Sequence, residues 1–271
     1  MFQIEVKDEA VMAEVEKAAA PAQKQDVPRP SHEAAKERSP PPEPSGSASW
    51  NPARRAKENA VYIPEHFRVD NQADKTAFMR EHPFAILISS TDEGPFATHL
   101  PLSVHARDER LILRGHVAKA NPHWRHLEKH PNCLAIFHGP HAFISTANYT
   151  TPETVPTWNY GAVHAYGNAR VFASPEELQG MLHELIATFE PRFAAQWASL
   201  SESYRNRMLS HIVGFEITAT KIEAKFKLSQ NRSPEEQANV IASLEKAEDT
   251  AVSGVSRLMR ELGLGLQKPS E

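Results

Sequence analysis

The feature of this sequence that most constrains its fold is a series of short segments with strand character, separated by turn residues. Residues 84–91 (FAILISST) form an apolar run typical of a buried strand, and residues 92–94 (DEG) predict a turn into a return strand at 95–102. Residues 105–110 are polar and turn-like. Further strands are predicted at 111–115, 134–138, 142–147, 160–172 and 214–227, with Gly139 and Pro140 as the turn before residue 142.

Helical patterns come mostly after these strands. Ser174 and Ser233 each precede the sequence Pro-Glu-Glu, which is a capping box with proline at the first helical position, and predict helices to about residues 189 and 247. Other helices are predicted at 123–130, near 203–211 and at 252–262. Six or more short strands with helices added late predict a mainly β fold with flanking helices, built on a small antiparallel barrel.

Composition places bounds on the class of protein. The chain has 271 residues, a net charge of −4 and one cysteine, Cys133. A single cysteine excludes an intramolecular disulfide, and its apolar neighbours predict a buried structural thiol. No apolar stretch approaches the ~20 residues that a membrane span needs. Early acidic residues such as Glu5, Asp8 and Glu9 argue against secretory and import signals, so we expect a cytoplasmic protein.

The sequence divides by composition into three parts. Residues 1–59 hold eight of the 21 prolines and few aromatic residues, and the run PPPEPSGSAS lacks the apolar surface that would offset its ordering entropy. We therefore expect a disordered N-terminal arm at 1–59, one folded domain at 60–263 with the C-terminal helices included, and a flexible tail at 264–271.

The segment 115–124 (GHVAKANPHW) carries chemistry typical of a phosphate site. It leads from a predicted strand into a predicted helix, and it supplies His116, Lys119 and Asn121 at that junction. Free N–H groups at the start of a helix bind anions, and a lysine adds positive charge. A plain structural turn is equally consistent with the spacing.

Two further sets of residues suit a flat, partly apolar ligand. Thr98, His99 and Leu100 end the second predicted strand, and Trp158 and Asn159 precede the long one. A flavin needs flat apolar walls, a few polar groups for the ring edge and cations for its phosphate. Core packing is the alternative for Trp158.

The segment 225–232 (KFKLSQNR) joins the last predicted strand to a capped helix. It adds positive charge and hydrogen-bond donors through Lys227, Gln230 and Arg232. These groups suit a phosphate, a partner subunit or nucleic acid, and a solvated strand end is an equally good interpretation.

Histidine is abundant, with nine of the 14 between residues 82 and 141. His123, His126 and His130 would share one helix face, but no acidic residue or cysteine stands nearby at a familiar ligand spacing, so we predict no metal site. The sequence also lacks GxSxG, Walker A, GxGxxG and paired-cysteine zinc patterns.

Six ordered motifs together resemble one family, the PaiB-type FMN-binding negative transcriptional regulators. The resemblance covers residues 61–262 and omits the first 59. Six motifs in order are far more specific than any one of them. They are VYIPEHF (61–67), ATHLPL (97–102), GHVAKANPHW (115–124), FHGPHAFIS (137–145), VPTWNYGAVHAYG (155–167) and KLSQNR (227–232).

The resemblance implies an FMN-binding split β-barrel like that of pyridoxamine-phosphate oxidases, and a homodimer with FMN at the subunit interface. His116, Lys119 and Asn121 would then hold the phosphate, while His99 and Leu100, with Thr98 beside them, would line the ring. The remaining candidates would come from the partner subunit: Trp158, Asn159, Lys227, Gln230 and Arg232.

Function within this fold stays open between several classes. A regulator or flavin-dependent sensor follows from the resemblance, and an FMN-dependent oxidoreductase of unknown substrate is the main alternative, with His99 and Tyr160 as candidate acid or base. The many histidines leave a haem-binding barrel as a third interpretation. DNA is a partner by resemblance alone, because the sequence shows no clear helix-turn-helix.

Overall fold

The computed structural model describes residues 61–107 and 110–266. The predicted disordered arm at 1–59 lies outside these residues, as does most of the predicted tail at 264–271. Among the described residues, no helix is both long and apolar enough to cross a bilayer.

One antiparallel sheet of seven strands organises the described residues, in the order β2-β1-β5-β6-β7-β4-β3. Every neighbouring pair of strands in this order is antiparallel. The strands are β1 (Phe84–Thr91), β2 (Gly94–Pro101), β3 (Ser103–Arg107), β4 (Arg110–Ala118), β5 (Asn132–Ile144), β6 (Thr157–Phe172) and β7 (Ile212–Lys227).

The sheet closes on itself at Leu102. β2 and β3 lie at its two opposite edges, yet Leu102 is the single residue that separates them in the chain. The sheet therefore curls until its edges meet, and Leu102 is fully buried at the corner. This arrangement is the predicted split β-barrel, because the edges meet at one corner without a continuous ladder between them.

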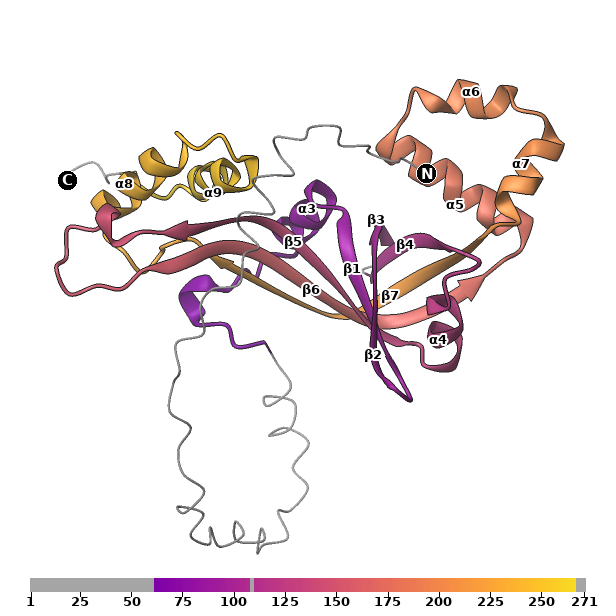
Figure 1. The fold of residues 1–271 in the computed structure, drawn as a ribbon, viewed down its shortest axis with the longest axis horizontal. Coiled ribbons are helices and arrows are strands. Elements are labelled where there is room, and N and C mark those ends of the chain that lie inside the picture. Colours follow the sequence, from indigo (N-terminus) through magenta and orange to yellow (C-terminus); the bar gives the residue numbers. More distant parts are fainter. Residues whose placement is uncertain (1–60, 108–109, 267–271) are drawn as a thin grey trace, which may run out of the picture. The chain divides into compact units, whose positions relative to one another are not determined.

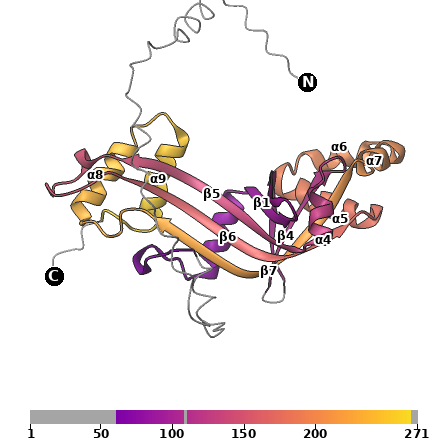
Figure 2. The ribbon, with the colours of Figure 1, turned by 60° about the horizontal axis from the view of Figure 1, so that its bottom comes forward.

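The helices flank the sheet. Three strands, β5, β6 and β7, are long and carry α8 and α9 near one end, while β1–β4 and α5–α7 lie near the other (Figures 1 and 2). The helices are α3 (Gln72–Glu81), α4 (His123–Lys129), α5 (Pro175–Phe189), α6 (Phe193–Ser199), α7 (Glu202–Leu209), α8 (Pro234–Leu244) and α9 (Thr250–Glu261), with 3-10 turns η2 (Glu65–Phe67) and η3 (Thr146–Asn148).

Local sequence signals explain much of this. Ser174 and Ser233 accept hydrogen bonds from the backbone N–H groups of Glu177 and Glu236, so both serines cap their helices as predicted. The reciprocal bond of a full capping box is absent from both described helix starts, because Glu177 accepts from the Ser174 hydroxyl and Glu236 accepts from Thr150 and Thr151. Cys133 is buried as predicted, and burial raises the pKa of its thiol to about 12.

Two predictions about the strands were wrong. Residues 134–138 and 142–147 do not form a hairpin around Gly139 and Pro140, because β5 continues through them with a register irregularity between His138 and His141. Proline is compatible with a sheet at such an irregularity, where no ladder N–H is needed. A Cβ on Gly139 would lie 2.5 Å from the ring of Phe78, so close packing requires this glycine.

The polar segment 105–110 was predicted as a turn, but β3 extends to Arg107. Only Ser103 and Val104 of this edge strand are buried, and the rest of its side chains face solvent or lie half-exposed, which gives it the composition of a loop. Sequence patterns also missed α3 and the short α6.

A charged cluster ties α5 to the sheet. Arg114 on β4 donates to Glu184 of α5 at 2.8 Å and to Glu216 of β7 at 2.9 Å, with its side chain 16% exposed. Arg170 donates to the other oxygen of Glu216 at 3.0 Å. Burial alone would raise the pKa of Glu216, but hydrogen bonds from Arg170 and Arg114 lower it overall.

We expect Arg114→Met to lower the free energy of unfolding by about 1–3 kcal/mol, because it leaves two partly buried carboxylates without their shared donor. Urea unfolding at pH 7 measures this. Arg68→Met is the control, since its pair with Asp70 is exposed at 50% and 75% and should contribute at most about 1 kcal/mol. Equal losses in the two variants would contradict the assignment.

Candidate functional site

A buried polar network joins β2 to the turn before α4. Thr98 Oγ1 accepts from Asn121 Nδ2 at 3.3 Å and hydrogen-bonds with His123 Nδ1 at 2.7 Å. The other ring nitrogen of His123 hydrogen-bonds with Ser89 Oγ at 3.0 Å, and His123 is fully buried. Two predicted site residues, Thr98 and Asn121, are therefore brought together, and His123 holds them there.

The network keeps His123 neutral. Burial, with a smaller contribution from the neighbouring His126, lowers the pKa of His123 from 6.5 to about 4. A neutral imidazole donates at one nitrogen and accepts at the other, and both roles can be met here because each hydroxyl partner can donate or accept. Within the described residues, no group of three or more His, Cys, Asp or Glu side chains is placed to hold a metal.

Most backbone N–H groups of the turn between β4 and α4 already donate to other atoms of the protein. The N–H of Lys119 donates to His211 O at 2.7 Å, that of Asn121 to Ala118 O at 2.8 Å, and that of His123 to Asn121 Oδ1 at 3.0 Å. An anion at this turn would rely chiefly on the exposed side chain of Lys119, which borders a cavity of about 360 Å³ beside α5 and α7.

His116 lies apart from the turn. It pairs across the sheet with Gly214, so both face the same side, where the ring of Phe172 fills the space above Gly214. Burial lowers the pKa of His116, and its Nδ1 is buried without a hydrogen-bond partner among the described residues. A ligand atom that donates to this nitrogen or accepts from it would supply the missing hydrogen bond.

His99 and Leu100 point to opposite sides of β2. The His99 ring is exposed and stacks on Phe84 with ring centroids 6.4 Å apart and an interplanar angle of 30°, and Phe84 is itself 63% exposed. Together these rings form a flat, accessible wall. Leu100 belongs to the core instead.

The other predicted residues gather where β7 ends. Lys227 donates to Thr157 Oγ1, and Arg232 donates to Thr154 Oγ1 at 2.8 Å. Asn159 is fully buried and donates to Ser229 Oγ at 2.9 Å. These side chains, apart from Thr154, border one small cavity of about 200 Å³.

Gln230 and Trp158 do not face that cavity. Gln230 braces its own turn, since its side chain accepts from the N–H of Leu228 at 2.7 Å and donates to Phe226 O at 2.5 Å. Trp158 is 53% exposed, so it is not a core residue, and it pairs across the sheet with the exposed Phe143.

The predicted residues thus fall into two groups at opposite ends of β7. His116 pairs with Gly214 near its start, and Tyr160, next to Asn159, pairs with Lys227 at its end. The strand between Gly214 and Lys227 is roughly 40 Å long at about 3.3 Å per residue. This is longer than an FMN molecule, so one chain does not place both groups on one flavin.

The donor sets nevertheless fit FMN. The first group offers a flat wall at Phe84 and His99 and the unpaired nitrogen of His116. The second offers two cations, Lys227 and Arg232. Flat walls, sparse polar groups and cations are what this cofactor requires.

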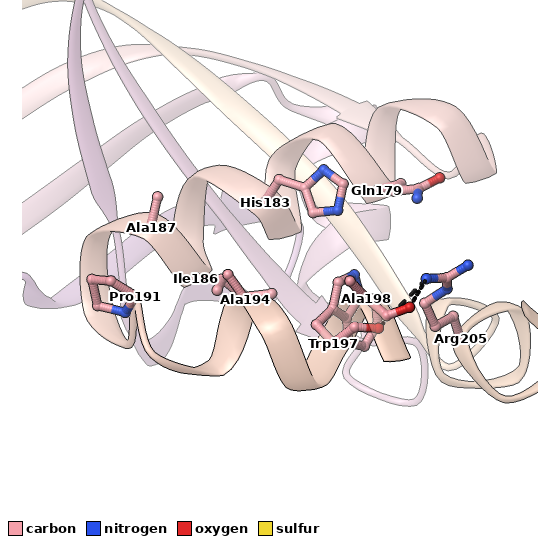
Figure 3. Close-up of a pocket in the computed structure, with 9 residues that line it drawn as sticks. All are labelled: Gln179, His183, Ile186, Ala187, Pro191, Ala194, Trp197, Ala198 and Arg205. Atoms are coloured by element: carbon pink, nitrogen blue, oxygen red, sulfur yellow. Dashed lines mark hydrogen bonds between the residues drawn. The ribbon is translucent and has the colours of Figure 1, made fainter. Parts of the chain in front are cut away.

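A larger cavity of about 520 Å³ lies in the helical segment between β6 and β7, among α5, α6 and α7 (Figure 3). Its walls are mainly alanine, Ile186, Pro191 and Trp197, with Gln179, His183 and Arg205 as polar members. Arg205 is held by the carbonyl groups of Trp197 and Ala198. None of the predicted cofactor residues lines this cavity.

Sequence reasoning missed the supporting residues His123 and Ser89. His123 was considered only as a metal ligand on a helix face. The available signal was its position two residues after Asn121, where an asparagine side chain caps the start of a helix and fixes the next residues.

Comparisons with known proteins identify the family to which this chain is similar. Residues 61–221 match the family described as "Putative FMN-binding domain". "Protease synthase and sporulation protein PAI 2" of Bacillus subtilis (strain 168) is 37% identical over 203 residues, which cover 74% of this chain and 97% of that protein. An uncharacterized protein of Emericella nidulans is 27% identical over 227 residues, covering 68% of this chain and 90% of that one. The flavocytochrome Anf3 structure from Azotobacter vinelandii aligns with a TM-score of 0.46 at 15% identity, covering 61% of this chain and 72% of that one.

We expect stability to fall as the pH drops from 7 to 4. The unfolded chain protonates His123 near pH 6.5 and the folded chain near pH 4, so the unfolded state binds more protons between these values. The full shift corresponds to about 3 kcal/mol. Urea unfolding at pH 7.5, 6 and 5 should show a flatter pH dependence for His123→Gln than for the wild type.

The control is His66→Gln, since His66 is exposed and its replacement should leave the wild-type pH dependence intact. A His123→Gln variant with the wild-type slope would show that this buried histidine is not the titrating group.

Proposed function

Because the chain belongs to the PaiB-type family of FMN-binding split-barrel proteins, we propose that it works as a homodimer that holds FMN between two copies and serves in gene regulation. Bound FMN would supply redox chemistry at the interface. We also propose that the protein is cytoplasmic, which fits its one buried cysteine and a regulatory role.

The observation that carries this proposal is the separation of the two groups of candidate residues. They lie at opposite ends of β7 in one chain, roughly 40 Å apart along the strand. A two-fold axis crossing the sheet would run a second copy antiparallel to the first, and would bring the β7 end of one copy to the β2 and β4 region of the other. Each flavin would then contact His99, His116 and Lys119 from one chain and Trp158, Lys227 and Arg232 from its partner.

An apolar sheet face supports the same arrangement. Ile86 on β1 pairs with Ile136 on β5, and Ile88 pairs with Leu134, so the four side chains share one face. All four remain half-exposed although their strands lie inside the sheet. A continuous apolar face of this kind is typical of a protein interface, and the symmetric copy is its natural occupant.

We expect the wild-type protein to run as a dimer in size-exclusion chromatography with light scattering and to show flavin absorbance after FMN loading and desalting. Ile136→Asp should produce monomers and weaken FMN binding at least tenfold, because it buries a charge in the apolar face. The control is Phe189→Asp, which replaces an exposed apolar residue on α5. A monomeric Ile136→Asp protein with unchanged FMN affinity would contradict a site shared between subunits, and circular dichroism confirms that both variants fold.

Direct regulation through DNA has its own readout. We expect the dimer to shift a promoter fragment with an affinity that falls steeply as salt rises, because counterions are released from the phosphates. An affinity for duplex DNA that is independent of salt, or absent, would assign the regulatory role to a protein partner instead.

A further inference from the structure

The small cavity at the end of β7 has the composition of an anion site. It measures about 200 Å³, and its polar lining includes Lys227, Arg232, Thr157, Asn159, Ser229 and Tyr149. We name it the Lys227–Arg232 cavity. Its size admits an acidic group such as a phosphate or a carboxylate.

Positive charge in this cavity lacks a full counterpart. Lys227 has no carboxylate within ion-pair distance among the described residues, and burial, followed by the repulsion of Lys225, lowers its pKa. Arg232 has Glu236 at 4.0 Å. The other oxygen of that buried carboxylate accepts from the N–H groups of Thr150 and Thr151 at 3.0 and 3.2 Å. Arg232 therefore has one carboxylate at the limit of ion-pair distance, which is shared with two backbone donors, and Lys227 has none among the described residues.

Unpaired donor capacity also lies beside this cavity. Tyr149 lies under the Arg232 guanidinium, 4.0 Å from carbon to ring centroid, and its hydroxyl is buried without a partner among the described residues. A buried hydroxyl without a hydrogen bond lowers stability, and an oxyanion that accepts from it would remove that cost.

The backbone at Ser229 is held in a strained form. Its φ of 65° is the only positive value among the described non-glycine residues, and the residue is 3% exposed. Its hydroxyl and the amide of Asn159 hydrogen-bond to each other at 2.9 and 3.3 Å, and Gln237 donates to its carbonyl at 3.2 Å. Strain that is held by several buried hydrogen bonds is typical of a preorganised site.

We propose that the Lys227–Arg232 cavity is an oxyanion subsite that binds the phosphate or carboxylate group of a small ligand. Lys227 and Arg232 supply charge, Tyr149 and Thr157 supply hydroxyl donors, and Asn159 with Ser229 fixes the wall. Two sources offer this chemistry: the phosphate of an FMN held by the partner subunit, or the acidic group of a second small molecule that enters beside the flavin. The subsite exists on the single chain, so it does not require that FMN binding be correct.

The first experiment uses inorganic phosphate and acetate as probes, by calorimetry on the full chain prepared without flavin. Wild type should bind at least one of them. Lys227→Met and Arg232→Met should each weaken binding by about tenfold or more, since charge-assisted hydrogen bonds are lost. Lys221→Met is the matched control, because Lys221 lies on the same strand and pairs with Glu223. Lys227→Arg should restore part of the affinity.

Tyr149→Phe tests the subsite with little effect on folding. It removes one unpaired oxygen and no packing atoms, so it should stay folded and still lose a few-fold in affinity. The proposal is overturned if neither anion binds wild type, or if Lys227→Met, Arg232→Met and Tyr149→Phe, each folded by circular dichroism, bind like Lys221→Met.

A second experiment distinguishes the two sources by comparing FMN with riboflavin. If FMN supplies the anion, Lys227→Met weakens FMN binding but leaves riboflavin binding unchanged, and saturating FMN abolishes phosphate binding. If a second molecule supplies it, FMN affinity is unchanged and phosphate binds the FMN-loaded protein as well as the flavin-free one. Failure of flavin binding altogether would refute the proposed function and leave the phosphate measurement intact.

Discussion

The closure of the sheet at Leu102 is the constraint on which the rest of the structure depends. One residue carries the chain from one edge of a seven-stranded sheet to the other, so the strands between these edges must curl into a barrel. The corner is packed tightly: a Cβ on Gly115 would lie 2.8 Å from the Leu102 side chain and 3.2 Å from the carbonyl of Pro101. The close packing at this corner therefore explains why position 115 is a glycine.

The same corner explains why the polar groups of the predicted phosphate turn are already hydrogen-bonded to other protein groups. Closing the barrel brings β2 against the turn after β4, and Thr98 then lies within hydrogen-bond distance of Asn121 and His123. Buried hydroxyl and imidazole groups need partners, and these residues satisfy one another. Asn121 therefore works first as a structural residue, and charge for an anion at this end comes from the exposed Lys119.

Local and periodic signals were the predictable part of the fold. Alternation gave the long strand β6, and capping boxes gave the starts of α5 and α8, because each signal depends on neighbours within a few residues. β3 and the continuity of β5 escaped detection because tertiary context decides them. β3 is an edge strand with polar side chains, and Pro140 sits at an irregularity that only the β6 pairing reveals.

The candidate site shows the same division. Residue types such as Lys227, Arg232 and His99 could be recognised from motifs, but their separation along β7 depends on strand register, which no motif encodes. Nor could the sequence reveal that the Gln230 side chain hydrogen-bonds within its own turn. It also could not reveal that the ring of Tyr149, from a distant segment, stacks on the Arg232 guanidinium.

The uneven distribution of charge follows from this register. At the β7 start, Arg114 and Arg170 share Glu184, Glu216 and Glu177, so each buried or half-buried cation there has a carboxylate. At the β7 end, Arg232 has only Glu236 among the described ion pairs, and Lys225 and Lys227 have no carboxylate there. Cations that lack a full counter-charge in a small cavity lower stability, because their Coulomb attraction does not offset the hydration that they lose. At the other end of β7, carboxylates offset that cost. At this end, a negatively charged ligand in the proposed subsite would offset it instead.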